Sequence, residues 1–97
     1  MYAVIFKAEI NELDQSYSET ASRMQELAIS QYSCTEFTSV TEGGQEISIS
    51  YWDSLEDIKA WKQDPEHLSA QQAGRDIWYK SYRVQVVETL HDYTYES

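Results

Sequence analysis

The sequence is poor in cysteine, proline and glycine: Cys34 and Pro65 are each the only residue of their kind, and glycine occurs three times. A single thiol excludes an internal disulfide and a zinc site built on cysteines. The two histidines and the scattered acids show no ligand spacing either, so we predict no metal. We expect Cys34 to pack in the core of a protein from a reducing compartment, which indicates the cytoplasm.

Basic residues and long apolar runs are also scarce. Seven lysines and arginines stand against seventeen acids, which gives a formal net charge of −10. Such a surface repels phosphate backbones and anionic lipid surfaces, so we predict neither a nucleic-acid partner nor a membrane partner. No segment approaches the length of a membrane span, and the apolar start, Met1 to Lys7, is too short for a signal peptide.

The composition is sufficient for one packed domain that spans residues 1–97. Hydrophobic residues make up 41% of the chain, which suits a packed core. Hydrophobic periodicity predicts strands at 2–9, 33–41, 45–52 and 78–90, and helices at about 15–31, 54–64 and 65–74. Gly43 and Gly44 supply a hairpin turn, and Pro65 ends one helix and begins the next. The polar tail, 91–97, is predicted to be loose or to pair with a partner chain.

The order of the predicted elements, β-α-β-β-α-β, is that of the ferredoxin-like α+β fold, with an antiparallel sheet and both helices on one face. In the third strand Ile47, Ile49 and Tyr51 alternate with polar residues, so we expect these three to face the core. Val84 and Val86 of the last strand are expected on the helix-free face. Because a bare apolar sheet face is typical of an interface, the sequence predicts a homodimer that buries sheet against sheet.

The second half of the chain carries a family resemblance. The run Tyr51–Lys62 closes a strand and opens a helix, and it is followed by Glu66–Arg75, Trp78-Tyr79 and Tyr82. This pattern resembles the antibiotic-biosynthesis-monooxygenase-like family, especially its small stand-alone bacterial members. The resemblance implies a ferredoxin-like domain that dimerises through its sheets into an α+β barrel. The family contains cofactor-independent oxygenases of aromatic polyketides, quinol oxygenases, haem-degrading enzymes and members without known activity.

The haem-degrading branch of that family fits the sequence least well. That branch has an Asn in its first strand, a Trp in its second helix and a His roughly ten residues after the Trp. Trp61 matches the Trp, but Gln71 stands ten residues later, His67 comes too early, and the first strand has no Asn. We therefore expect any catalysis to proceed without a cofactor, with haem breakdown as the less favoured reading.

The candidate catalytic residues are His67 and Arg75. An imidazole titrates near neutrality, so His67 is a candidate base toward a phenol, and Arg75 is a candidate donor to an anionic or quinone oxygen. Each also has a purely structural interpretation. His67 can hydrogen-bond to local backbone, and Arg75 can pair with Asp64, with Glu66 or with an acid of a partner chain.

The candidate substrate-binding residues are aromatic: Trp61, Trp78, Tyr51 and Tyr82. Trp61 shares a helix face with Leu55 and Ile58, so core packing is its alternative role. Core packing is also the default for Tyr51, whereas Trp78 and Tyr82 can equally pack at the dimer seam. Together these residues lead to the hypothesis of a cofactor-independent monooxygenase that acts on a small aromatic phenol or quinol. The alternative is a non-catalytic module that binds or senses a small ligand.

Overall fold

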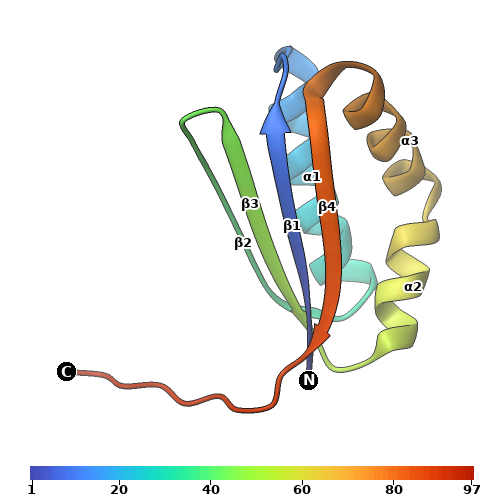
Figure 1. Ribbon diagram of the computed structural model, residues 1–97. Coiled ribbons are helices and arrows are strands. Elements are labelled where there is room, and N and C mark those ends of the chain that lie inside the picture. Colours follow the sequence, from blue (N-terminus) through green and yellow to red (C-terminus); the bar gives the residue numbers. More distant parts are fainter.

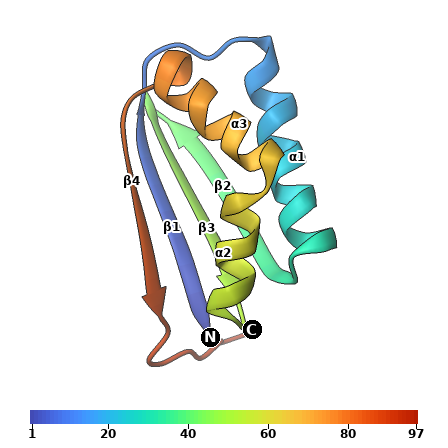
Figure 2. The ribbon, with the colours of Figure 1, turned by 90° about the vertical axis from the view of Figure 1, so that its right-hand side faces the viewer.

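The computed structural model describes residues 1–97 as one four-stranded antiparallel sheet covered by helices on a single face (Figures 1 and 2). The strand order in the sheet is β2-β3-β1-β4. This order confirms the predicted ferredoxin-like α+β fold. In chain order the elements are β1 (Tyr2–Ile10), α1 (Gln15–Gln31), β2 (Cys34–Glu42), β3 (Gln45–Trp52), α2 (Leu55–Gln63), α3 (Pro65–Ala73), the π-helical turn η1 (Gly74–Trp78) and β4 (Tyr79–Glu88).

Three helices begin at side-chain caps. Asp14 accepts a hydrogen bond from the backbone N–H of Tyr17 at the start of α1, and Ser54 does the same for α2. Asp64 caps α3, where Pro65 occupies the first turn and its missing N–H costs nothing. These caps satisfy N–H groups that a helix leaves unpaired, and they explain why the predicted breaks between elements are confirmed.

The last strand differs from its predicted bounds. We expected a strand over 78–90, but Gly74–Trp78 forms η1 and β4 runs from Tyr79 to Glu88. The extra turn continues α3 and delivers the Trp78 side chain to the interior, where it is buried. After Glu88 the Thr89 N–H donates to the Met1 carbonyl, and the tail then extends away from the sheet (Figure 1).

The core lies between the sheet and the helices. It contains Val4, Leu27, Ala28, Cys34, Trp52, Ile58 and Trp61. Trp52 is fully buried, its indole Nε1–H donates to the Ser50 hydroxyl at 2.9 Å, and its ring lies 5.2 Å from that of Trp61. Cys34 packs in this core as predicted, and burial raises the pKa of its thiol, which makes it a poor nucleophile.

The structure contradicts our expectation of which residues lie on which face of the sheet. Register places Phe6 between Ser48 and Val84, and Phe6, Ser48 and Val84 all line the helix-covered side. Since side chains alternate along a strand, Ile47, Ile49 and Tyr51 lie on the helix-free face, and Val84 and Val86 lie on the helix-covered face of the edge strand β4. The prediction was wrong because it took the apolar side of β3 to be the core side.

Candidate functional site

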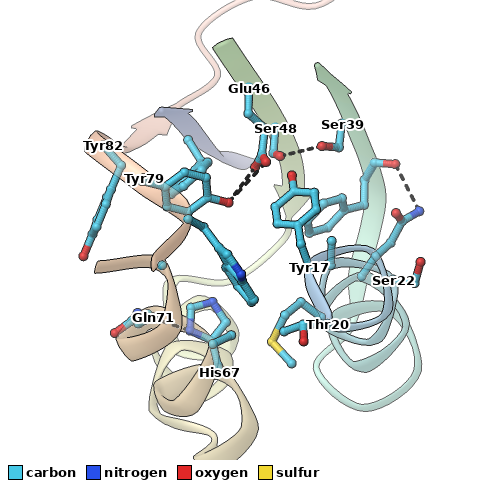
Figure 3. Close-up of a pocket in the computed structure, with 18 of the residues that line it drawn as sticks. Tyr17, Thr20, Ser22, Ser39, Glu46, Ser48, His67, Gln71, Tyr79 and Tyr82 are labelled. Atoms are coloured by element: carbon cyan, nitrogen blue, oxygen red, sulfur yellow. Dashed lines mark hydrogen bonds between the residues drawn. The ribbon is translucent and has the colours of Figure 1, made fainter. Parts of the chain in front are cut away.

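A cavity of about 430 Å³ separates the sheet from the helices (Figure 3). Its lining comes from all four strands and from α1, α2, α3 and η1. Small side chains leave this space: Ser39 and Ser48 on the strands, Ala21 on α1, and Ala70 and Gly74 on the opposite wall. The volume lies within the range of pockets that hold small organic molecules.

Aromatic rings form much of the cavity wall. The Phe6 ring lies 5.3 Å from that of Tyr79 and 5.6 Å from that of Tyr82, measured between centroids. Tyr17 of α1 meets Trp78 edge to face at 5.4 Å. Because such rings offer both apolar faces and polar edges, this wall is suited to a planar aromatic ligand.

The sheet end of the cavity is polar. Glu46 of β3 is only 5% exposed, and the Tyr79 hydroxyl donates to its two carboxylate oxygens at 3.2 and 3.3 Å. Burial raises the pKa of the Glu46 carboxyl, and burial together with the Glu46 charge raises the pKa of the Tyr79 phenol. Next to Glu46 the Ser48 hydroxyl donates to the Ser39 hydroxyl at 2.9 Å.

The opposite end carries His67 of α3 (Figure 3). Its ring packs edge to face on Trp61, with the centroids 4.2 Å apart, and the Gln71 Nε2 lies 3.2 Å from its Nδ1. Burial, helped by the nearby Lys62 charge, lowers the pKa of His67 to about 4. The imidazole is therefore neutral at pH 7. With the Gln71 amide donating to Nδ1, the ring proton lies on Nε2.

Two contacts between elements hold α3 in place. The Arg23 guanidinium of α1 donates to both carboxylate oxygens of Glu66, at 2.8 and 2.9 Å. The Tyr32 hydroxyl at the end of α1 donates to Asp64, the cap of α3, at 2.6 Å, and this bond lowers the pKa of the Asp64 carboxyl. Because Glu66 directly precedes His67, these bonds fix the helix turn that presents the imidazole.

The structure brings four of the six predicted site residues to the cavity. His67, Trp61, Trp78 and Tyr82 line it. Trp61 is also part of the core, and its indole N–H is buried without a hydrogen-bond partner. The Trp78 indole donates to Asp14 at 3.0 Å, so this ring is held in one orientation.

The other two predicted residues, Arg75 and Tyr51, are not part of the cavity lining. Arg75 is exposed on η1 and donates to the Tyr82 hydroxyl at 3.2 Å and to the Gln72 side-chain oxygen Oε1 at 3.1 Å, rather than to Asp64 or Glu66. Tyr51 points to the helix-free face with Ile49. The shift of Tyr51 follows from the exchanged faces of β3.

Sequence reasoning missed Glu46, which is the most unusual residue of the site. The available signal was its place in β3, where Glu46, Ser48 and Ser50 share one side of the strand with Trp52. A large buried Trp at the end of that row indicates that the row faces the core. The same row therefore predicts a polar, poorly filled interior, which is where the cavity lies.

Comparison with known proteins adds a sequence relative. No family model matches the chain. The uncharacterised protein YqjZ of Bacillus subtilis (strain 168) is 44% identical over 88 residues, which cover 90% of this chain and 77% of that protein. The chain belongs to the YqjZ family. None of the helices of this YqjZ relative is both long and apolar enough to cross a membrane.

Solved structures place the YqjZ relative in a known fold. Rv0793 from Mycobacterium tuberculosis superposes with a TM-score of 0.81 at 14% identity, over 96% of this chain and 98% of that one. SnoaB, a cofactor-independent oxygenase from Streptomyces nogalater, superposes with a TM-score of 0.78 at 11% identity, over 94% of each chain. A candidate antibiotic biosynthesis monooxygenase from Nitrosomonas europaea gives 0.78 at 15% identity, over 94% and 100%. The fold is therefore that of the antibiotic-biosynthesis-monooxygenase-like proteins, which confirms the resemblance.

Proposed function

We propose that the protein is a cofactor-independent monooxygenase that acts on a small aromatic phenol or quinol in the cavity between the sheet and the helices. The observation that carries the proposal is the cavity itself. It has about 430 Å³ of space, aromatic walls, and polar groups at two opposite ends. In this proposal a planar ring lies against the aromatic wall to which Phe6, Tyr82 and Trp78 belong, with its hydroxyl groups toward the polar ends.

In this reaction the substrate itself supplies the electrons that reduce oxygen, so the protein needs no redox group. A phenol that has lost its hydroxyl proton is rich in electrons and can reduce oxygen itself. A carbon of the ring then loses its hydrogen and gains one oxygen atom to give a quinone, and the second oxygen atom leaves as water with the two hydrogens. The residues must exclude bulk water, orient the ring and accept the hydroxyl proton. Among the lining groups, a neutral His67 imidazole and a Glu46 carboxylate can accept a proton at neutral pH, whereas the Lys and Tyr side chains already hold theirs.

The fold neighbours support this choice of chemistry among the functions that such a cavity allows. SnoaB is described as a cofactor-independent oxygenase, and it has the same fold. Shared fold alone does not carry activity, so the proposal rests on the cavity, and the neighbours only narrow the reaction class.

Oxygen uptake measured with a panel of quinols and anthrone-like phenols tests the proposal. We expect the rate of oxygen uptake to rise in proportion to the concentration of wild-type protein, and one atom of labelled oxygen to appear in the product. His67→Ala is expected to slow turnover, because it removes one polar end of the cavity. The His91→Ala variant is the matched control and is expected to keep wild-type turnover, since His91 lies in the exposed tail and does not line the cavity. If the wild type consumes no oxygen with any of these substrates, the monooxygenase proposal is wrong, and a ligand-binding protein without catalysis becomes the favoured function.

We also propose that the helix-free face of the sheet is covered by a second copy of the chain, giving the homodimeric barrel that the family resemblance implies. This face carries Ile5, Ile47, Ile49 and Tyr51, which are half-buried, together with Val40, which is 59% exposed. Such a contiguous apolar surface is unusual on a monomer.

Light scattering on a size-exclusion column tests the dimer. Wild-type protein is expected to have twice the mass of the chain. Ile49→Glu places a charge at the centre of the face and is expected to give monomers. Ala60→Glu adds the same charge on the exposed side of α2 and is expected to leave the dimer intact. A monomeric wild type would contradict the proposal.

A further inference from the structure

Glu46 is the only carboxylate that lines the cavity. The sheet register sets it opposite Ala8 of β1 and Thr41 of β2. The small side chain at Ala8 gives the carboxylate room on the helix-covered side, and the result is an acid that is 95% shielded from solvent at the end of a ligand-sized space. A buried carboxylate that no cation pairs with normally costs stability, so a chemical role is the more plausible reason for its position.

The partners of Glu46 are neutral hydroxyl groups. The Tyr79 phenol donates to both carboxylate oxygens, and the Ser48 side chain is also within hydrogen-bonding reach. No Lys or Arg forms an ion pair with Glu46. The two salt bridges of the chain join Arg23 to Glu26 and to Glu66. A carboxylate offers about four lone-pair positions, and these few donors leave acceptor capacity for a ligand.

His67, at the other end, is the weaker proton acceptor of the two. Its Nδ1 already accepts from the Gln71 amide, so the neutral ring presents an N–H at Nε2. Burial also lowers the pKa of its conjugate acid to about 4, whereas burial raises the pKa of Glu46. A raised pKa makes the carboxylate a better base, and a lowered pKa makes the imidazole a poorer one.

We propose that Glu46 is the group that anchors the substrate hydroxyl and accepts its proton, and that the cavity therefore selects neutral phenols over aromatic acids. This assignment rests on the proposed function for the identity of the substrate class. In the proton-transfer step the O–H bond of the phenol breaks, the proton passes to a Glu46 carboxylate oxygen, and the electron pair stays on the phenolate oxygen. Tyr79 positions the carboxylate through its hydroxyl, and the Nε2–H of His67 serves as a donor at the far end of the ring.

The same geometry explains the selectivity. A phenol can donate a charge-assisted hydrogen bond to the carboxylate, which is among the stronger kinds of hydrogen bond. An aromatic carboxylate of the same size brings a second negative charge against Glu46 in a poorly solvated space, and the like charges repel. The cation of the lining is Lys62, which acts on His67 at the opposite end and does not offset this repulsion.

Calorimetric binding of 2-naphthol and 2-naphthoate, both without oxygen, tests the assignment. The two probes share one ring system and differ in charge at neutral pH. We expect wild type to bind 2-naphthol about ten-fold more tightly than 2-naphthoate. Glu46→Gln is expected to weaken 2-naphthol binding about ten-fold and to bring the two affinities within about three-fold of each other. Glu42→Gln changes an exposed acid at the end of β2 and is expected to keep the wild-type preference.

Glu46→Gln is nearly the same shape as the wild type and removes a buried charge, so it is expected to fold; its melting temperature checks this. Equal binding of both probes by wild type, or an unchanged preference in Glu46→Gln, would overturn the assignment. Because the binding is measured without oxygen, a positive result stands even if the protein shows no oxygen uptake. The failure of the monooxygenase proposal and the failure of the Glu46 assignment are therefore distinguishable.

Discussion

Folding stability at mildly acidic pH should depend on His67. Burial lowers its pKa from 6.5 to about 4, so the folded protein favours the neutral imidazole. The resulting stability is fully present above pH 6.5 and is lost as the pH falls toward 4. At about pH 5.5 the unfolded chain holds a proton on this ring roughly ten times more often than not, which stabilises the unfolded state by about 1.4 kcal/mol. Because the His67 side chain is only partly buried, solvent screening reduces this value, and we expect about 1 kcal/mol.

The assay compares urea unfolding at about pH 7.5 and about pH 5.5 for wild type and His67→Gln. Protonation of His67 in the unfolded chain contributes to the fall in unfolding free energy of wild type at the lower pH, and it cannot contribute in His67→Gln. Between these pH values the unfolding free energy of wild type should therefore fall by about 1 kcal/mol more than that of His67→Gln. The His91→Gln control changes a histidine in the exposed tail and should follow wild type. Equal falls in wild type and His67→Gln would refute the buried, neutral imidazole.

Four further substitutions test the cavity. Trp61→Phe removes an indole N–H that is buried without a partner, whereas Trp78→Phe breaks the indole bond to Asp14, which is worth about 1 kcal/mol. Trp61→Phe should therefore lower the melting temperature less than Trp78→Phe, and the reverse order would contradict the described packing. Gly74→Ala places a Cβ 3.0 Å from the Tyr79 ring, so it should shift that ring and weaken 2-naphthol binding in calorimetry; unchanged affinity would contradict the contact. Ser48→Val fills cavity space, so it should weaken 2-naphthol binding without lowering the melting temperature, and unaltered binding would place the ligand elsewhere.

The elements of the fold could be predicted because their signals are local. Ser54 and Asp64 cap helices through bonds to backbone groups two residues away, and Pro65 fixes a helix start by its own ring. The Gly43-Gly44 turn follows from positive φ angles of 60° and 79°, which glycine adopts without strain. Such chemistry can be read from a few consecutive residues.

The faces of the sheet could not be predicted in this way. Alternation in β3 separates Ile47, Ile49 and Tyr51 from Glu46 and Ser48, but it does not say which set lies under the helices. In a lone domain the apolar set would be buried. Here the polar set borders a cavity and the apolar set forms the helix-free face, an arrangement that depends on pairing with distant strands.

The candidate site was accordingly found in part. Trp61 shares a helix face with Leu55 and Ile58, which indicates an inward side. His67 was chosen for its titratable ring and Trp78 for its aromatic ring, and all three line the cavity. Glu46 was missed because the opposite side of β3, with Ile47, Ile49 and Tyr51, was taken to face the core. Arg75 was chosen for its charge, which carries no information on direction, and η1 directs it outward to Tyr82.

The central claim is that the cavity between the sheet and the helices is the ligand site, and the three indole N–H signals in a proton–nitrogen NMR spectrum test it most directly. Trp61 and Trp78 line the cavity, whereas Trp52 is buried against Ser50 and does not. Titration with 2-naphthol is predicted to shift the Trp61 and Trp78 signals and to leave the Trp52 signal in place. Saturable binding that moves neither cavity indole would contradict the claim.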